Sequence, residues 1–414
     1  SIHLIIFIYK MTKKKEPIDK IKLDGLNLRI FESGIKKKNT DLLLITFPKF
    51  SSVSGVFTKS KTPSYAVMDC RHKIKLKKKN IKCLLVNSGN ANAFTGIKGQ
   101  ICVKTITKFL SKKFKCNQNE IFTSSTGVIG EVMDPLKITS CINANKPLFI
   151  NSFKEAAKSI MTTDTFPKYT CAKVKYKHFE ANVVGIAKGS GMIAPNMGTM
   201  LAYIFTDINI SSSILQKILI KENEKTFNSI TVDSDTSTSD TCLLISTNKL
   251  KNKKIDKFSD KNLIGFKECI SDIMLDLAKK IVIDGEGAKK IIKICVEKAK
   301  SNISAKKIAF SIANSPLVKT AIAGEDANWG RIIMAIGKSF EEVKQDKIKI
   351  KFGNQLVTEK GMKCSNYSEK ILTNYLKGNE IEISVDIGMG DKTWTVYTCD
   401  LTEKYIRINA DYRS

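Results

Sequence analysis

The sequence predicts an α/β fold. Short apolar runs typical of buried strands alternate along the chain with longer stretches in which apolar residues recur at helical spacing. A chain of 414 residues is too long for one compact core, so we expect two lobes, or one large layered domain with an extension. The hydrophobic content of 42% is ordinary for a globular protein.

Periodicity places the individual elements. Apolar residues three and four positions apart predict helices from Gly99 to Lys113 and from Leu263 to Ile281. Continuous apolar character predicts strands at Leu42–Phe47, Ile81–Val86, Glu180–Ala187, Met200–Phe205, Thr241–Thr247, Ile308–Ile312, Ile381–Ile387 and Thr393–Cys399. The C-terminal segment Tyr405–Ser414 also has a strand pattern, which favours a docked chain end. Lysine-rich stretches predict exposed loops at Lys36–Lys38, Lys77–Lys79 and Lys251–Lys254, the last being the best candidate for a lobe boundary.

The net charge of +29 is carried almost entirely by lysine. Only five of the 69 basic residues are arginines, and the lysines are spread through every segment. Nucleic-acid sites favour arginine forks and stacked aromatic side chains on one face. We therefore interpret the charge as a solvated lysine surface that can attract anionic small molecules, and we expect no nucleic-acid partner.

Cysteine and histidine usage excludes other classes of site. The eleven cysteines include no Cys-x-x-Cys pair, and several lie in apolar runs, which predicts buried free thiols in a reducing compartment. Three isolated histidines give no basis for a metal site or a Ser-His-Asp triad. The apolar stretch Ile2–Tyr9 is too short to span a bilayer and lacks the charge order of a signal peptide. We expect a cytoplasmic protein without a membrane partner.

The segment Lys188–Asp207 carries the chemistry of greatest interest. A Gly/Pro/Asn-rich turn ends in Gly198-Thr199 and leads into an apolar strand. A threonine hydroxyl is a poor nucleophile unless a base lies beside it, and cutting the chain before the threonine makes its own α-amine that base. Gly198 followed by Thr199 has the residue types that such a self-cleaving bond requires.

Other glycine-rich and acidic motifs do not match known ligand loops. Lys188-Gly-Ser-Gly has its lysine before the glycines and a strand after them, so it is not a phosphate loop. Gly388-Met-Gly390 lacks the third glycine of a dinucleotide fingerprint. The acidic segment Asp233–Asp240 lacks the glycine and terminal glutamate of a calcium loop, so we interpret it as an acidic, hydroxyl-rich turn.

Four polar segments leave two interpretations open. Ser124–Gly130 is a polar strand-to-helix turn or, through Thr126 and Gly127, a pair of oxyanion donors. Asn87–Asn92 is a turn with spare amides or a substrate loop, and Met161–Lys168 is a helix end or a pocket wall. Asp284–Gly287 is a bare acidic turn or a site for a substrate ammonium.

The order of these motifs resembles that of the ornithine acetyltransferase family, the glutamate N-acetyltransferases of arginine biosynthesis. The resemblance covers about residues 20 to 414. It is carried by five segments: Met161–Thr165, Lys188–Leu201, Asp284–Gly287, Ala323–Arg331 and Arg407–Ser414. The family usually has alanine before its nucleophile, whereas this chain has Gly198, which eases strained geometry but also widens the unfolded ensemble.

The resemblance implies a self-cleaving enzyme with an α/β fold, a layered helix–sheet–sheet–helix sandwich with a smaller second lobe. Residues 1–19 would be a disordered N-terminal extension, 20–198 the α chain and 199–414 the β chain, with a second lobe from about residue 250. Cleavage between Gly198 and Thr199 would separate the two chains, and two copies of each would assemble as α2β2.

The implied reaction is ping-pong acetyl transfer from N2-acetyl-L-ornithine to L-glutamate through acetyl-Thr199. Thr126 and Gly127 match the family's oxyanion donors. The positions that match its substrate-binding residues are Thr165, Lys188, Thr199, Glu286, Asn409 and Ser414. Lys188 suits an amino-acid carboxylate, and Glu286 suits the ornithine side-chain ammonium. No metal and no cofactor are expected, while acetyl-CoA stays open as a second donor.

Two other functions remain as alternatives. One keeps the threonine nucleophile but has water as the acyl acceptor, as in an aminopeptidase or amidase of the N-terminal-nucleophile type. The other is a basic nucleic-acid-binding protein, which predicts steeply salt-dependent retention on polynucleotide.

Overall fold

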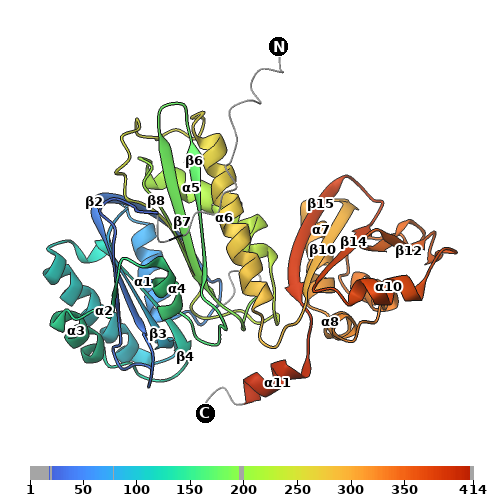
Figure 1. The fold of residues 1–414 in the computed structure, drawn as a ribbon, viewed down its shortest axis with the longest axis horizontal. Coiled ribbons are helices and arrows are strands. Elements are labelled where there is room, and N and C mark those ends of the chain that lie inside the picture. Colours follow the sequence, from blue (N-terminus) through green and yellow to red (C-terminus); the bar gives the residue numbers. More distant parts are fainter. Residues whose placement is uncertain (1–17, 19–20, 78, 195–199, 411–414) are drawn as a thin grey trace. The chain divides into compact units, whose positions relative to one another are not determined.

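The computed structural model describes residue 18 and residues 21–77, 79–194 and 200–410. These residues form two units, each with its own sheet and core (Figure 1). Unit 1 takes the described residues up to Gly189 together with 200–228 and 236–278. Unit 2 takes 190–194, 229–235 and 279–410, so two short segments that precede its main part in the chain belong to it.

Unit 1 is built on one mixed sheet. Its main path runs β4 (Ile121–Val128), β3 (Asn80–Asn90), β2 (Leu42–Phe57), β9 (Thr241–Ser246), β8 (Leu201–Thr206), β7 (Glu180–Lys188) and β6 (Lys168–Lys175). At one side of this path, β1 (Asn27–Phe31) pairs with β2, and β5 (Phe149–Ile150) pairs with β1. The β3–β4 and β8–β9 pairs are parallel, and the other neighbours are antiparallel.

The long strand β2 joins two halves of this sheet. Its first residues pair with β3, and its last six residues pair with β9. One buried cluster contains Leu43 and Leu84 from the first half together with Val184 and Tyr203 from the second. The sheet therefore bends so that its two halves pack face to face as separate layers.

Helices cover the outer faces of both layers. The helices of unit 1 are α1 (Tyr65–Ile74), α2 (Gly96–Phe114), α3 (Pro135–Ala144), α4 (Phe153–Ser159), α5 (Ser212–Lys225) and α6 (Leu263–Ile283), the last as far as Ala278. α2 and α3 bury Leu110 and Ile138 against Leu85 of β3. α6 lies so close to β7 that a Cβ on Gly185 would come within 2.8 Å of the Ile273 and Leu277 side chains. The predicted helix–sheet–sheet–helix architecture is confirmed.

Unit 2 has a smaller sheet with its own helices. The strand order is β13 (Met362–Lys363), β12 (Gln355–Glu359), β11 (Lys349–Phe352), β14 (Glu380–Asp386), β10 (Ile291–Ala299) and β15 (Lys392–Cys399). The helices are α7 (Asn302–Ala313), α8 (Pro316–Ala323), α9 (Trp329–Gly337), α10 (Glu369–Leu376) and α11 (Glu403–Ala410). Trp394 of β15 donates its indole N–H to the Ser229 hydroxyl at 3.0 Å, which ties one of the short segments to this sheet.

Two predicted strands are wrong. Ile308–Ile312 lies inside helix α7, because Ala305, Ile308, Ala309 and Ile312 are three and four positions apart and are buried together. The C-terminal strand pattern from Tyr405 also fails, because its described part forms helix α11, in which no residue is buried. The other predicted strands and both predicted helices are present within a few residues of their expected bounds, except that the strand predicted at Leu42–Phe47 continues to Phe57.

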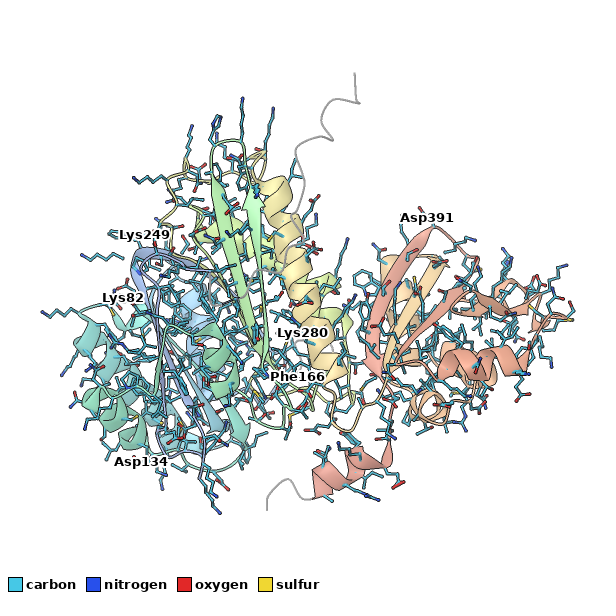
Figure 2. The ribbon with its side chains drawn as sticks, in the orientation of Figure 1. Lys82, Asp134, Phe166, Lys249, Lys280 and Asp391 are labelled. Atoms are coloured by element: carbon cyan, nitrogen blue, oxygen red, sulfur yellow. The ribbon has the colours of Figure 1, made fainter. Side chains whose placement is uncertain are left out.

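The lysine surface is visible over both units. Lysine side chains project outward along the periphery of the ribbon, and Lys249 is one of the exposed examples (Figure 2). All eleven cysteines are free, and seven of them are buried, as predicted. Among the described residues no helix is long and apolar enough to cross a bilayer, and no group of three metal-ligating side chains occurs.

Candidate active site

Thr126 and Gly127 lie on β4 where it pairs irregularly with β3. The register shifts at Gly89 and Asn90, so Asn90 faces both Thr126 and Val128. Gly127 has a φ of +132°, and a Cβ there would lie 2.3 Å from the carbonyl carbon of Gly89. Only glycine fits this approach, because any side chain would push the two strands apart. The sequence interpretation of Ser124–Gly130 as a plain strand-to-helix turn is therefore wrong, since β4 runs through Val128.

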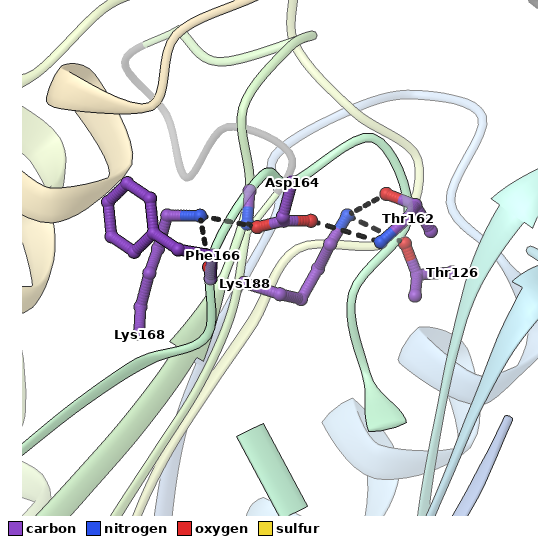
Figure 3. A network of polar contacts seen from close by, with 7 residues as sticks. Thr126, Thr162, Asp164, Phe166, Lys168 and Lys188 are labelled. Atoms are coloured by element: carbon purple, nitrogen blue, oxygen red, sulfur yellow. Dashed lines mark hydrogen bonds and ion pairs between the residues drawn. The ribbon is translucent and has the colours of Figure 1, made fainter. Parts of the chain in front are cut away.

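Lys188, at the end of β7, connects β4 to the turn after α4 (Figure 3). Its ammonium donates to the Thr162 hydroxyl at 2.7 Å and to the Thr126 hydroxyl at 3.3 Å. The Lys188 side chain is 2% exposed, so its charge acts in a poorly hydrated environment. Since the Thr126 oxygen accepts from Lys188, its own O–H is free to point elsewhere.

Asp164 holds this arrangement together (Figure 3). Its carboxylate accepts from the Lys168 ammonium at 2.6 Å, from the Gly189 N–H at 2.7 Å and from the Thr162 N–H at 3.0 Å. Burial raises the pKa of this carboxyl, but the opposing charges of Lys188 and Lys168 and the Gly189 N–H outweigh burial and lower the pKa to about 2. Asp164 is thus a stable anion that fixes the backbone on either side of the site.

A second polar cluster lies within unit 2 around Glu286. The Asn409 amide of α11 donates to the Glu286 carboxylate at 2.8 Å. The Glu286 N–H donates to the Ser190 carbonyl at 2.8 Å, and a Cβ on Gly191 would lie 2.4 Å from the Glu286 carboxylate. A carboxylate whose orientation is fixed in this way suits a cationic partner. The predicted residues Glu286 and Asn409 are therefore in direct contact, although 123 positions separate them in the chain.

Two aspartates of the acidic segment hydrogen-bond to the described backbone before and after residues 195–199. Within unit 2, Asp233 accepts from the N–H groups of Met192 and Ile193 at 2.7 and 2.9 Å. The Tyr405 hydroxyl donates to the same carboxylate at 3.1 Å. The Asp233–Asp240 segment is therefore more than an acidic turn, because its Asp233 carboxylate acts as a clamp that fixes the backbone at Met192 and Ile193 through hydrogen bonds.

The second clamp, Asp240, lies within unit 1. It accepts from the Met200 N–H at 3.1 Å, while the Thr241 N–H donates to the Met200 carbonyl at 3.1 Å. Burial raises the pKa of Asp240 well above its usual value. Its second oxygen, Oδ2, is buried without a hydrogen-bond partner.

Thr165, another predicted site residue, is exposed in the turn between α4 and β6, directly after Asp164. The predicted nucleophile Thr199, the residue before it, Gly198, and the substrate position Ser414 lie outside the described residues.

Sequence reasoning missed Thr162, Asp164, Asp240 and Lys36. Thr162 and Asp164 lie in the segment interpreted as a helix end or a pocket wall, and Asp240 lies in the segment interpreted as an acidic turn; nothing local marks any of the three as an anchor of the backbone or of Lys188. Lys36 was assigned to an exposed loop, whereas it is half-buried and donates to the Met161 carbonyl at 2.6 Å. The missing signal is long-range, since Lys36 and Met161 are 125 positions apart.

Comparisons with known proteins agree with this arrangement over nearly the whole chain. The "Arginine biosynthesis bifunctional protein ArgJ" of Rhizobium meliloti (strain 1021) is 46% identical over 397 residues, covering 95% of this chain and 96% of the relative.

Solved structures match over smaller parts. The arginine biosynthesis bifunctional protein argJ of Bacillus halodurans is 40% identical, with a TM-score of 0.48, over 49% of this chain and 95% of that one. The ornithine acetyltransferase of Mycobacterium tuberculosis, complexed with ornithine, is 24% identical, with a TM-score of 0.36, over 43% of this chain and 94% of that one. A model of the ArgJ family matches residues 27–414, which include the described residues of both clusters, and the chain therefore belongs to the ArgJ family.

Proposed function

We propose that this member of the ArgJ family transfers the acetyl group of N2-acetyl-L-ornithine to L-glutamate, giving L-ornithine and N-acetyl-L-glutamate. Membership of a family whose curated relatives are named as arginine biosynthesis proteins supports the pathway. The single observation that best supports the chemistry is the buried Lys188–Thr126 contact beside Gly127, because it couples a carboxylate-binding cation to a pair of oxyanion donors.

Self-cleavage prepares the nucleophile. The Thr199 hydroxyl attacks the Gly198 carbonyl carbon, and the amide nitrogen leaves as an amine that takes up the hydroxyl proton. Water then hydrolyses the resulting ester, which leaves a carboxylate on Gly198 and a free α-amine on Thr199. The clamps of Asp233 on Met192 and Ile193, and of Asp240 on Met200, support this proposal because they hold backbone within a few residues of the bond on each side.

Acetyl transfer then proceeds in two half-reactions. The freed amine takes the proton of the Thr199 hydroxyl as the oxygen attacks the acetyl carbonyl of acetylornithine. The Thr126 hydroxyl and the Gly127 N–H donate to the oxyanion that forms. Ornithine leaves with the proton, and acetyl-Thr199 remains. The α-amine of glutamate attacks this ester, which releases N-acetylglutamate and regenerates Thr199.

Two charged residues are proposed to bind the two charged groups of acetylornithine. Lys188 binds the α-carboxylate that both substrates share, and Glu286, oriented by Asn409, binds the ornithine side-chain ammonium. Thr165 and Ser414 are further substrate-binding positions in this proposal. The reaction requires no metal and no cofactor. Acetyl-CoA is a second donor in the bifunctional form of the reaction, in keeping with the name of the relatives.

Assembly and location complete the proposal. The fragments 20–198 and 199–414 stay together as α and β chains in an α2β2 enzyme of the cytoplasm. Eleven free cysteines support a reducing compartment.

Mass spectrometry and a two-donor assay test this function together. Purified protein should consist of two fragments divided before Thr199, and Thr199→Ala should abolish both the division and acetyl transfer. Acetylornithine and acetyl-CoA are compared as donors at fixed glutamate. An intact chain with full transfer activity would contradict the processing step, and release of free acetate at the rate of transfer would favour a hydrolase.

A further inference from the structure

Lys36 places a second, half-buried cation beside Lys188. The Lys36 ammonium donates to the carbonyl of Met161, while the Lys188 ammonium donates to the hydroxyl of Thr162, the next residue. Both contacts belong to unit 1. The two ammonium groups are therefore held on neighbouring residues of one turn.

The stem of Lys36 is fixed next to the oxyanion donors. A Cβ on Gly89 would lie 2.9 Å from Lys36 Cγ, and Gly89 in turn contacts Gly127 across the β3–β4 pair. Glycine at position 89 thus leaves the space through which the lysine passes. This packing brings Lys36 to the strand pair that presents Thr126 and Gly127.

No carboxylate neutralises Lys36 by direct contact among the described residues. The Asp41 carboxylate is engaged instead by the backbone N–H groups of Ser33, Ile35 and Lys36, at 2.6, 2.7 and 2.9 Å. Burial is the main reason that the pKa of Lys36 is lowered; Asp41 opposes this, and the Lys188 charge adds to it. A half-buried cation beside another cation creates a positive potential that an anion would relieve.

The proposed reaction supplies a matching anion. Donor and acceptor share an α-carboxylate, but only glutamate carries a second carboxylate. The two carboxyl carbons of glutamate are separated by four bonds, a span suited to two ammonium groups held by adjacent residues.

We propose that Lys36 is a second carboxylate-binding residue, which together with Lys188 selects a dicarboxylic amino acid as the acyl acceptor. Lys36 binds the carboxylate that glutamate has and ornithine lacks. This inference rests on the proposed function and deepens it, because it separates acceptor recognition from donor recognition.

Lys36→Met tests the inference, since methionine keeps the apolar stem against Gly89 and removes the charge. We expect the KM for glutamate to rise by about tenfold or more, whereas the burst of ornithine released from acetylornithine should stay within about twofold of wild type. The preference for glutamate over glutamine as acceptor should fall by a similar factor. Lys36→Arg should restore most of it, and Lys36→Gln, which keeps a donor to Met161, should behave like Lys36→Met.

Lys37→Met is the matched control, because Lys37 is exposed on the same loop and loses the same charge. It should leave both half-reactions unchanged. An unchanged glutamate KM in Lys36→Met and Lys36→Gln, or an equal loss in both half-reactions, would overturn the inference while the proposed function stands. A wild-type enzyme without an ornithine burst would overturn the proposed function and this inference with it.

Discussion

Single buried carboxylates organise the candidate site. Asp164 and Asp240 are both buried, yet their pKa values shift in opposite directions. Burial raises the pKa of each, but at Asp164 the charges of Lys188 and Lys168 outweigh burial and lower the pKa to about 2, whereas at Asp240 the effect of burial prevails. The difference follows from the partners and not from burial, because burial alone raises the pKa of both groups.

Asp164→Asn should destabilise unit 1 by about 3 kcal/mol, because it leaves the buried Lys168 ammonium without its counter-charge. The pKa of Asp164 is lowered from 3.8 to about 2, so its stabilisation is complete above about pH 4. It is lost as the pH falls from there towards 2. Urea unfolding at pH 7 and between pH 4 and 2 measures both effects. Adding Lys168→Met should recover part of the loss; full additivity of the two changes would contradict the pairing.

Asp240→Ala should slow self-cleavage at least tenfold, because the Met200 N–H loses its acceptor and the residue after Thr199 is held on one side only. Asp240→Asn keeps a side-chain oxygen that can accept from the Met200 N–H, so it should cleave within a few-fold of wild type. Asp235→Asn changes an exposed acid of the same turn and serves as control. Mass spectrometry of the precursor over time measures the rate. Equal cleavage in the alanine and asparagine variants would exclude a positioning role for Asp240.

Among the elements, the β3–β4 pair matters most for chemistry. It brings Gly89 and Gly127 into a backbone contact that no side chain could fill, and it turns a polar strand end into a pair of candidate donors. Strand character up to Val128 was not evident from Ser124–Thr126, because hydroxyl residues occur in turns as often as at strand ends. Pairing with the neighbouring strand β3 is what extends β4 to Val128.

Gly127→Ala should lower kcat for acetyl transfer by more than tenfold, because the added Cβ would lie 2.3 Å from Gly89 and displace β4. Gly130→Ala is the matched control, with a positive φ of +88° but nothing within 4 Å of its added Cβ. It should cost about 1 kcal/mol of stability and leave kcat nearly unchanged. Steady-state kinetics and thermal unfolding of both variants give the comparison. A kcat for Gly127→Ala equal to that of Gly130→Ala would contradict the close approach.

At the element scale, long periodic segments could be predicted and mixed ones could not. The apolar stripe of α6 specifies a helix because it continues over five turns, and the buried strands β3, β7 and β9 follow from continuous apolar runs. Ile308–Ile312 was assigned wrongly because five residues rich in isoleucine fit either period. In the structure Ala305 and Ile308 are buried on one face of α7, so the helical period is the correct one for this segment.

The molecule as a whole divides differently from its linear order. Unit 2 takes up 190–194 and 229–235, although residues on both sides of each segment belong to unit 1. Lys319 of α8 shows how unit 2 retains one of them: its buried ammonium donates to the Val232 carbonyl and the Thr398 hydroxyl, each at 2.8 Å, and to the Cys399 carbonyl at 2.5 Å. One side chain thus connects a short segment to β15.

Lys319→Met should destabilise unit 2 by about 2 kcal/mol, because at least two buried carbonyl groups lose their donor. Hydrogen exchange should speed up in 229–235 and in β15, while exchange in β2 and β3 of unit 1 stays unchanged. Lys370→Met, on the exposed part of α10, is the control and should alter neither. Uniform loss of protection across both units would contradict separate cores.

The sequence by itself determined the family, the α/β class and the layered architecture, because ordered motifs and apolar periodicity are local properties of the chain. It also singled out Lys188, Glu286 and Asn409, whose roles as binding residues stay predictions. Only the tertiary structure decided that the pKa of Asp164 is lowered, that the pKa of Asp240 is raised and that Lys36 lies beside Lys188. These states depend on burial and on partners from distant segments, such as Lys188 and Thr126, 62 positions apart, and no local pattern encodes them.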